Sequence, residues 1–144
     1  MWKEGGRMDS ELIPIQFNKI MQSPSYTVFI LGTEAKQFAI YTSPHVGVQI
    51  QMHLTDQMKP RPYTHDLMNS IFNGLNIELL HVVISDVQDT IYYARLFLEQ
   101  VVGETKQIME IDARPSDCLS LALENNVPIY CTKEVFDKVL SIDP

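Results

Sequence analysis

The sequence is poor in several features that would assign it to a familiar class. It has two cysteines, Cys118 and Cys131, which are too few for a disulfide framework or a four-ligand zinc site. No apolar run approaches the roughly 18 residues of a membrane helix, and residues 1–7 lack the apolar core of a signal peptide. The six glycines are scattered and form no phosphate-binding loop or dinucleotide fingerprint. These absences favour a cytoplasmic protein with reduced thiols and no membrane partner.

Basic residues are also few. The chain has 11 Lys+Arg against 18 Asp+Glu, a net charge of −7. Polyanions repel such a chain at long range, which disfavours a protein that coats nucleic acid or a membrane but leaves a small basic or metal-assisted site open. The 144 residues, 45% of them apolar, indicate one globular domain. We expect a flexible leader at residues 1–9 and a single domain at residues 10–144.

Runs of β-branched and aromatic residues predict most of the regular structure. The expected strands are Glu11–Met21, Tyr26–Leu31, Gln37–Tyr41, Ile77–Val87, Thr90–Leu98, Gln107–Asp112 and Val127–Cys131. The strands Ile77–Val87 and Thr90–Leu98 are expected to form a hairpin. Pro128 makes the last strand an expected edge strand, because proline cannot donate a ladder hydrogen bond.

Four short helices are predicted between these strands. Their expected caps are Ser43, before Pro44, then Thr64 and Thr132, while Pro115 opens the third helix. Apolar residues at helical spacing include Leu67, Ile71 and Leu75 in the second helix, and Val135, Val139 and Leu140 are expected to face inward in the last one. The order is not a regular βαβα alternation. It predicts an α+β fold with a mixed, largely antiparallel sheet and short helices packed on it.

One weak internal similarity accompanies this order. Ile40–Pro44 and Ile111–Pro115 both lead from a strand through proline into a helix. Aligning the two prolines superposes three apolar pairs, which are Val48 with Leu119, Ile50 with Leu121 and Met52 with Leu123. Two explanations stay open: an ancestral strand–helix duplication, or the common use of proline at the first position of a helix.

The first cluster of reactive side chains is Arg61-Pro62-Tyr63-Thr64-His65-Asp66. His65 and Asp66 are predicted in the first turn of a helix, where the backbone N–H groups favour an anion. A histidine beside a carboxylate can act as a general base or bind a metal. The alternative is structural, with Thr64 as the cap, Asp66 complementing the helix dipole and His65 solvated.

The second cluster is Asp112-Ala113-Arg114-Pro115-Ser116-Asp117, at a predicted strand-to-helix junction. Its carboxylates can hold a divalent cation, while Arg114 can bind a phosphate in bidentate fashion. The alternative is again structural: Arg114 would pair with Asp112 or Asp66, and Asp117 would complement the helix dipole.

Together these clusters resemble two motifs of the bifunctional nuclease domain family. Residues 61–67 are similar to its R-P-x-T-H-D-L motif, and residues 112–117 to its D-A-R-P-S-D motif. The resemblance extends from about Glu11 to Leu140. One departure is Val46-Gly47, where the family usually has a Glu-Ala pair that opens a helix.

The resemblance implies a small α+β domain, and some family members are described as acting on both DNA and RNA. We therefore expect a nuclease with nucleic acid as substrate. The motif positions that carry over are Arg61, Thr64, His65, Asp66, Asp112, Arg114, Ser116 and Asp117. In this hypothesis Asp112 and Asp117, with Asp66 as a further candidate, hold Mg²⁺ or Mn²⁺, and His65 activates water. Arg61 and Arg114 neutralise the phosphate, with Thr64 and Ser116 beside them.

A second hypothesis is not enzymatic. It describes an oligomeric binding or regulatory module in which the Arg, Asp and His side chains form a structural polar network. Satisfied, buried side chains would favour this hypothesis, whereas unpaired oxygens in a cleft would favour catalysis. The apolar hairpin and exposed strand edges also predict a homo-oligomer, most simply a dimer.

Overall fold

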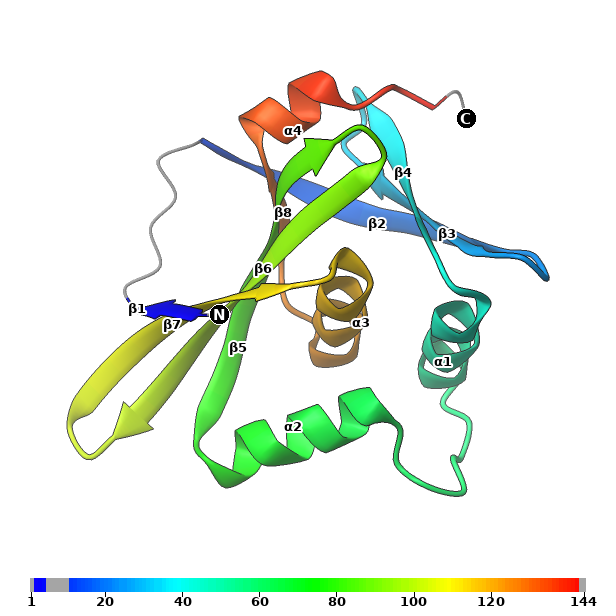
Figure 1. Cartoon of the computed structure of the whole chain (residues 1–144). Coiled ribbons are helices and arrows are strands. Elements are labelled where there is room, and N and C mark those ends of the chain that lie inside the picture. The colour runs from blue at the N-terminus through cyan, green and yellow to red at the C-terminus, as the bar shows by residue number, and fades with distance from the viewer. Residues whose placement is uncertain (1, 5–10, 143–144) are drawn as a thin grey trace.

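The computed structural model describes residues 2–4 and 11–142, which form one eight-stranded sheet and four helices (Figure 1). The strands are β1 (Trp2–Glu4), β2 (Leu12–Gln22), β3 (Thr27–Gly32), β4 (Gln37–Thr42), β5 (Ile77–Gln88), β6 (Ile91–Val102), β7 (Thr105–Ala113) and β8 (Ile129–Thr132). The helices are α1 (Pro44–Leu54), α2 (Thr64–Gly74), α3 (Pro115–Asn125) and α4 (Lys133–Lys138). None of these helices is long and apolar enough to cross a bilayer.

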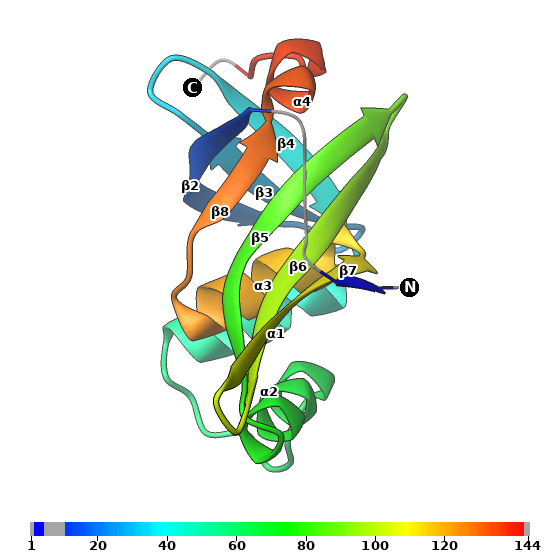
Figure 2. The same cartoon turned by 90° about the vertical axis from the view of Figure 1, so that its left-hand side faces the viewer.

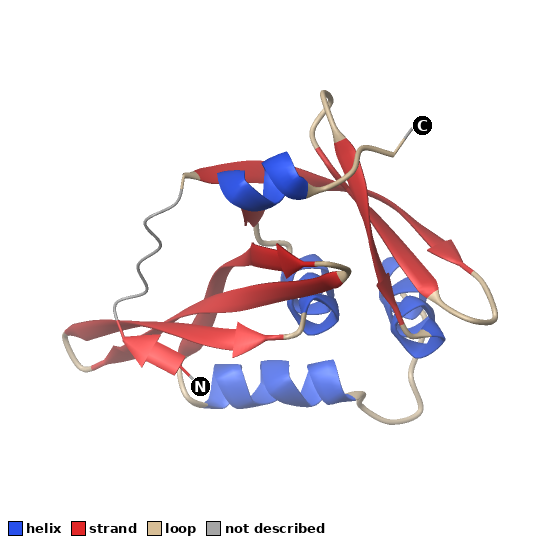
Figure 3. Ribbon diagram, turned by 45° about the horizontal axis from the view of Figure 1, so that its top comes forward, coloured by secondary structure: helices blue, strands red, loops and turns tan. Residues whose placement is uncertain are grey.

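The strand order is β1-β7-β6-β5-β8-β2-β3-β4. Every neighbouring pair is antiparallel except β5 and β8, which are parallel. The predicted α+β fold with a mixed, largely antiparallel sheet is therefore confirmed. The sheet is strongly twisted, and α3 lies between the β5–β6 pair and α1 (Figures 1 and 2). Figure 3 shows α4 apart from the other helices, beside β8.

Helix α3 is the centre of the core and positions the second motif. Cys118, Leu119 and Leu121 are fully buried against the sheet, and burying one leucine side chain contributes about 1.5–3 kcal/mol. Pro115 opens the helix, and Asn126 ends it in the left-handed conformation, with φ 57°. Asparagine tolerates that conformation better than most residues, so the predicted stop at Asn125-Asn126 is confirmed.

The expectation of an edge position for the last strand is wrong, because β8 lies between β5 and β2. Pro128 precedes the strand, which begins at Ile129, so the missing N–H interrupts no ladder hydrogen bond. Its carbonyl instead accepts a hydrogen bond from the Val82 N–H at 3.2 Å.

Three details of the predicted helices also change. Tyr63, not Thr64, is the N-cap of α2. The stripe of Leu67, Ile71 and Leu75 shares one face, but each side chain is about half exposed (49–56%). The face that packs inward carries His65, Met68 and Phe72. After α4, Leu140 is 86% exposed, because the chain has already left the helix at Val139.

The expected leader lies largely outside the described residues, which omit residues 1 and 5–10; residues 2–4 pair with β7. The two strand–proline–helix junctions share their backbone geometry: φ and ψ are −67° and 155° at Ser43, and −68° and 144° at Arg114. Their packing differs, since Val48 is exposed and Leu119 is buried. Proline at the first helical position accounts for the shared geometry, and a common ancestry stays a prediction.

Candidate functional site

The two motifs meet where α2 and α3 begin. Proline restricts the backbone of the preceding residue to an extended conformation, so Arg114, which follows β7, is the extended N-cap of α3 and the helix starts at Pro115. The side chains meet through His65 of α2, whose Nε2 lies 3.2 Å from Asp117 Oδ1 of α3. The fold therefore links the two motifs through one histidine–aspartate contact across 52 residues of sequence.

Arg114 and Asp117 form the most exposed part of this cluster. Arg114 Nε donates to Asp117 Oδ2 at 3.0 Å, and a terminal guanidinium nitrogen donates to Oδ1 at 3.2 Å. The hydrogen bond with His65 lowers the pKa of Asp117, and those from Arg114 act in the same direction against the effect of burial. The Arg114 side chain is 77% exposed, so a fixed cation is presented to solvent.

His65 is buried, and its Nε2 is engaged by Asp117. Its residue is 6% exposed, and the buried Nδ1 has no hydrogen-bond partner among the described residues. An ionised carboxylate can only accept, so we assign the proton to Nε2, which donates to Asp117. In this arrangement His65 holds the Asp117 carboxylate in place.

Asp112 differs from Asp117 in being unpaired. Ile111 and Ala113 pack against the core, so the alternation of β7 turns Asp112 to the other face, where it is exposed. It makes no hydrogen bond or ion pair within residues 11–142. Neither expected partner, Asp112 or Asp66, pairs with Arg114, because the closer Asp117 does. Asp112, Arg114 and Asp117 line one open cleft of about 590 Å³.

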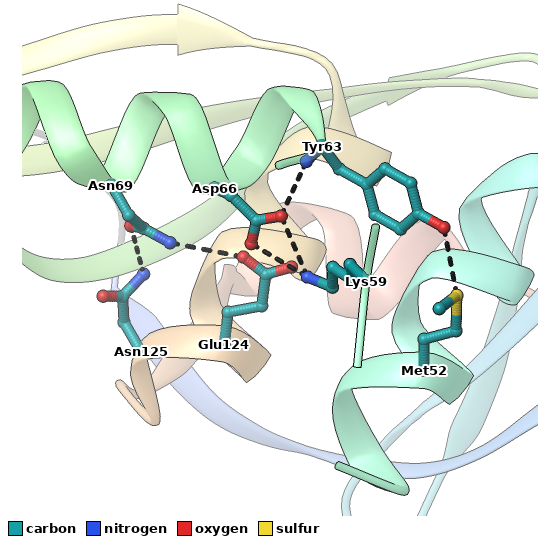
Figure 4. Close-up of polar contacts among 7 residues, drawn as sticks. All are labelled: Met52, Lys59, Tyr63, Asp66, Asn69, Glu124 and Asn125. Carbon is teal, nitrogen blue, oxygen red and sulfur yellow. Dashed lines mark hydrogen bonds and ion pairs between the residues drawn. The ribbon is translucent and has the colours of Figure 1, made fainter. Parts of the chain in front are cut away.

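In the first motif, at residues 61–67, the polar groups bind one another and the neighbouring Lys59 (Figure 4). Lys59 Nζ lies 2.9 and 3.0 Å from the two carboxylate oxygens of Asp66, and the Tyr63 N–H donates to Asp66 Oδ2 at 2.7 Å. Burial raises the pKa of Asp66, but the Lys59 ammonium and the Tyr63 amide together lower it by more. Asp66 is thus the carboxylate that fixes the start of α2.

Further hydrogen bonds tie this segment to the neighbouring helices, as Figure 4 shows. The Tyr63 hydroxyl donates to Met52 Sδ of α1 at 3.0 Å. Asn69 of α2 donates to Glu124 of α3 at 3.2 Å and accepts from Asn125 at 2.9 Å. Sequence reasoning missed Lys59 and Glu124 as partners. Lys59 stands in a proline-rich segment before a helix that begins with an aspartate, a pattern that could have indicated it, whereas nothing local marks Glu124.

The remaining predicted residues are dispersed. Arg61 is exposed and lines a second cleft, of about 400 Å³, with Lys59 and Asp66. Thr64 is exposed at the first position of α2, and Ser116 is buried in α3. The two clefts share no lining residue. The structure therefore brings His65, Arg114 and Asp117 together, places Asp112 in the same cleft, and keeps Arg61 and Asp66 apart from it.

The described residues do not form a ready metal cage. No group of three or more His, Cys, Asp or Glu side chains among them lies close enough to hold an ion. Both oxygens of Asp117 already accept hydrogen bonds from the Arg114 cation, which opposes a second cation there. Asp112 keeps its oxygens free, and Mg²⁺ is commonly bound by one or two carboxylates together with substrate phosphates.

The Val46-Gly47 departure is built into the packing of α1. A Cβ at Gly47 would lie 1.8 Å from Gln22 Oε1 and 2.5 Å from Thr27 Oγ1. These side chains hold the start of the helix, since Gln22 Nε2 donates to the Pro44 carbonyl at 3.0 Å and the Gly47 N–H donates to Thr27 Oγ1 at 3.2 Å. An alanine at position 47, as in the family's pair, would collide with this cluster.

Comparison with known proteins agrees with the motifs. A family model for the bifunctional nuclease domain matches residues 29–142. The chain belongs to the bifunctional nuclease domain family. The matched span begins in β3 and includes both motif clusters, so the family match covers the site as well as most of the sheet.

Several curated proteins share about half of the chain. An uncharacterized protein of Mycobacterium tuberculosis is 37% identical over 76 residues, which cover 53% of this chain and 42% of the relative. Bifunctional nuclease 1 of Oryza sativa subsp. japonica is 25% identical over 76 residues (53% and 23%), and that of Arabidopsis thaliana 25% over 87 residues (60% and 26%). The chain thus matches less than half the length of these relatives.

Proposed function

We propose that this protein hydrolyses phosphodiester bonds of nucleic acid in the cleft lined by Asp112, Arg114 and Asp117. The observation that carries the proposal is the joint placement of an exposed, anchored guanidinium and an unpaired carboxylate in one cleft of about 590 Å³. Family membership and the names of the plant relatives support it. The cytoplasmic location is proposed on the sequence argument alone.

Arg114 is assigned to the phosphate. Asp117 occupies one edge of the guanidinium, and the remaining N–H groups of this side chain are available to the non-bridging oxygens of a substrate. These donors stabilise the negative charge that grows on the phosphate as water attacks. Asp117 and His65 are positioning residues, because they fix the orientation of Arg114 and contact no substrate themselves.

Asp112 is assigned to the water, in place of His65, because Nδ1 of His65 is buried and its Nε2 is engaged by Asp117. The Asp112 carboxylate accepts the proton as the water oxygen attacks phosphorus, and the bond from phosphorus to the leaving sugar oxygen breaks. The leaving oxygen takes a proton from solvent. If Mg²⁺ or Mn²⁺ participates, Asp112 would hold it together with the substrate, and the ion would supply Lewis-acid stabilisation.

A cleavage assay on single-stranded DNA, duplex DNA and RNA tests this assignment, run in EDTA, in Mg²⁺ and in Mn²⁺. We expect cleavage by the wild type and a roughly 10²- to 10⁴-fold lower rate for Asp112→Asn. Asp56→Asn is the matched control: Asp56 lies outside the proposed cleft and has φ 54°, a conformation that asparagine accepts. The proposal would be rejected if Asp112→Asn cleaved at the wild-type rate and the cleavage activity separated from this protein during purification.

A binding or regulatory module without catalysis is the second candidate, and the first motif favours it. Asp66, Lys59 and Tyr63 satisfy one another as a structural network should. The same assay decides, because a pure module would bind oligonucleotide or another ligand without cleaving any of the substrates. In that case the Asp112→Asn protein and the wild type would be equally inactive.

We also infer that the protein is a homodimer joined through the exposed stripe of Leu67, Ile71 and Leu75. The residues of α2 include one acid, Asp66, already paired with Lys59, and no lysine or arginine. Two copies of this face can therefore pack without like-charge repulsion despite the net charge of −7. Sedimentation at micromolar concentration should give a dimer for the wild type and a monomer for Ile71→Asp. A monomeric wild type would refute the interface.

A further inference from the structure

The lining of the proposed catalytic cleft includes apolar and aromatic side chains that the nuclease hypothesis does not use. Besides the charged residues it is lined by Ile91, Tyr92 and Tyr93 of β6 and by Met68 of α2. Ile91 and Tyr93 are 61% and 39% exposed. Ile91 and Tyr93 therefore offer a ligand apolar and aromatic surface within the same cleft as Arg114 and Asp112.

The strand topology explains why these β6 side chains are exposed in the cleft. The last residue of β7, Ala113, pairs with Ala94 of β6. Residues 91–93 extend past that end and pair only with residues 86–88 of β5. Because the chain enters α3 at this point, β7 does not continue alongside residues 91–93, and these residues line the cleft together with Arg114.

A nucleotide unit matches this combination of charged and aromatic lining residues. Arg114 offers hydrogen bonds to a phosphate, and the tyrosine ring offers a face to a base. A cleft of about 590 Å³ lies within the range of roughly 300–1,000 Å³ that is usual for small-ligand sites. The other described clefts do not combine these features: the 400 Å³ cleft has no phenylalanine, tyrosine or tryptophan, the cleft beside α4 has no arginine, and the cleft at Asn73 and Glu99 has neither.

We propose that the cleft selects single-stranded nucleic acid by stacking one unpaired base on Tyr93 and Ile91 while Arg114 binds the adjoining phosphate. This inference rests on the proposed function and names its substrate class. A base inside a duplex has both faces covered by its neighbours and cannot stack on a side chain without being extruded. The acidic surface adds no broad attraction for a duplex, so the local contacts decide the preference.

Fluorescence anisotropy with labelled single-stranded and duplex oligonucleotides of one sequence, in EDTA, measures this preference without cleavage. The wild type should bind the single strand more tightly. Tyr93→Ala should weaken single-strand binding about 5- to 100-fold, the range for loss of one base–aromatic stack, and leave duplex binding nearly unchanged. Tyr93→Phe should retain the affinity, because it keeps the ring.

Tyr26→Ala is the matched control, since Tyr26 is 38% exposed, close to the 39% of Tyr93, but lies outside this cleft and packs edge-on against Tyr41. Equal affinities for Tyr93→Ala and wild type, or equal losses for single strand and duplex, would overturn the stacking proposal. Tight single-strand binding that depends on Tyr93, without cleavage in any metal, would keep the stacking proposal and refute the nuclease assignment. Cleavage that is insensitive to Tyr93→Ala would do the reverse.

Discussion

The two sequence motifs contain similar kinds of side chain, but the carboxylate of the first is fully hydrogen-bonded within the protein and one carboxylate of the second is unpaired. Around Asp66, the lysine and the backbone amide satisfy both carboxylate oxygens, and further hydrogen bonds join the segment to α1 and α3. Around Asp112, the carboxylate is unpaired and the neighbouring guanidinium is largely exposed. The first motif therefore fixes the arrangement of helices, and the second presents charge to a cleft.

The contact between His65 and Asp117 explains how both motifs serve one site. The contact joins α2, whose start is fixed by the first motif, to Asp117, the side chain that orients Arg114. A buried histidine with one unpaired nitrogen is costly, and the fold retains it at the junction of the two motifs. Similarity to a motif therefore does not by itself identify a reactive residue, because the hydrogen-bond partners of the side chain decide whether its polar atoms are free to react.

The largest effect that separates the two motifs should come from their arginines. Arg114→Lys is expected to lower the cleavage rate about a hundredfold, because lysine cannot bind Asp117 and a phosphate through a planar fork. Arg61→Lys, in the other cleft, should change it less than about threefold. Steady-state kinetics on one oligonucleotide measures both. Equal losses would show that the two clefts act together on the substrate.

A smaller effect, on stability rather than rate, should come from Asp66. Asp66→Asn removes the charge that Lys59 and the Tyr63 amide both bind, and should lower the free energy of unfolding by about 1.5–3 kcal/mol. Asp137→Asn is the control: its pair with Lys133 is more than half exposed on α4, so its loss is expected to change stability far less than the loss of the Asp66 charge. Urea denaturation measures both. A full loss of specific activity in folded Asp66→Asn would contradict its structural role.

The sequence predicts much of this molecule where local pattern decides. Pro44 and Pro115 open helices, Asn126 ends one, and the strands fall close to their expected bounds. The position of β8 could not be predicted, because Pro128 stands one residue before the strand, where its missing N–H leaves the ladder hydrogen bonds of Ile129–Thr132 intact. The outward face of Leu67, Ile71 and Leu75 also escaped prediction, since periodicity shows that residues share a face but not which side it meets.

The candidate site was predictable as a set of residues but not as a set of partners. The motifs identify His65, Arg114 and Asp117, yet nothing in the order of the chain indicates that Arg114 pairs with Asp117 rather than with Asp112 or Asp66. That choice follows from the turn at Pro115, which places residues 114 and 117 within one helical turn. The enclosure of His65 likewise depends on how α2 packs on α3, which is a property of the whole fold.

The smallest expected effect is a pH dependence that distinguishes the carboxylates. The pKa values of Asp66 and Asp117 lie below the ordinary 3.8 in the folded protein. The unfolded chain therefore binds protons first as the pH falls, so the stability from these groups is complete above about pH 5 and is lost as the pH drops through the folded pKa values. Urea midpoints between pH 6 and pH 3 should fall for the wild type and fall less steeply for Asp66→Asn. An Asp66→Asn curve as steep as that of the wild type would show that the Asp66 carboxylate does not stabilise the fold.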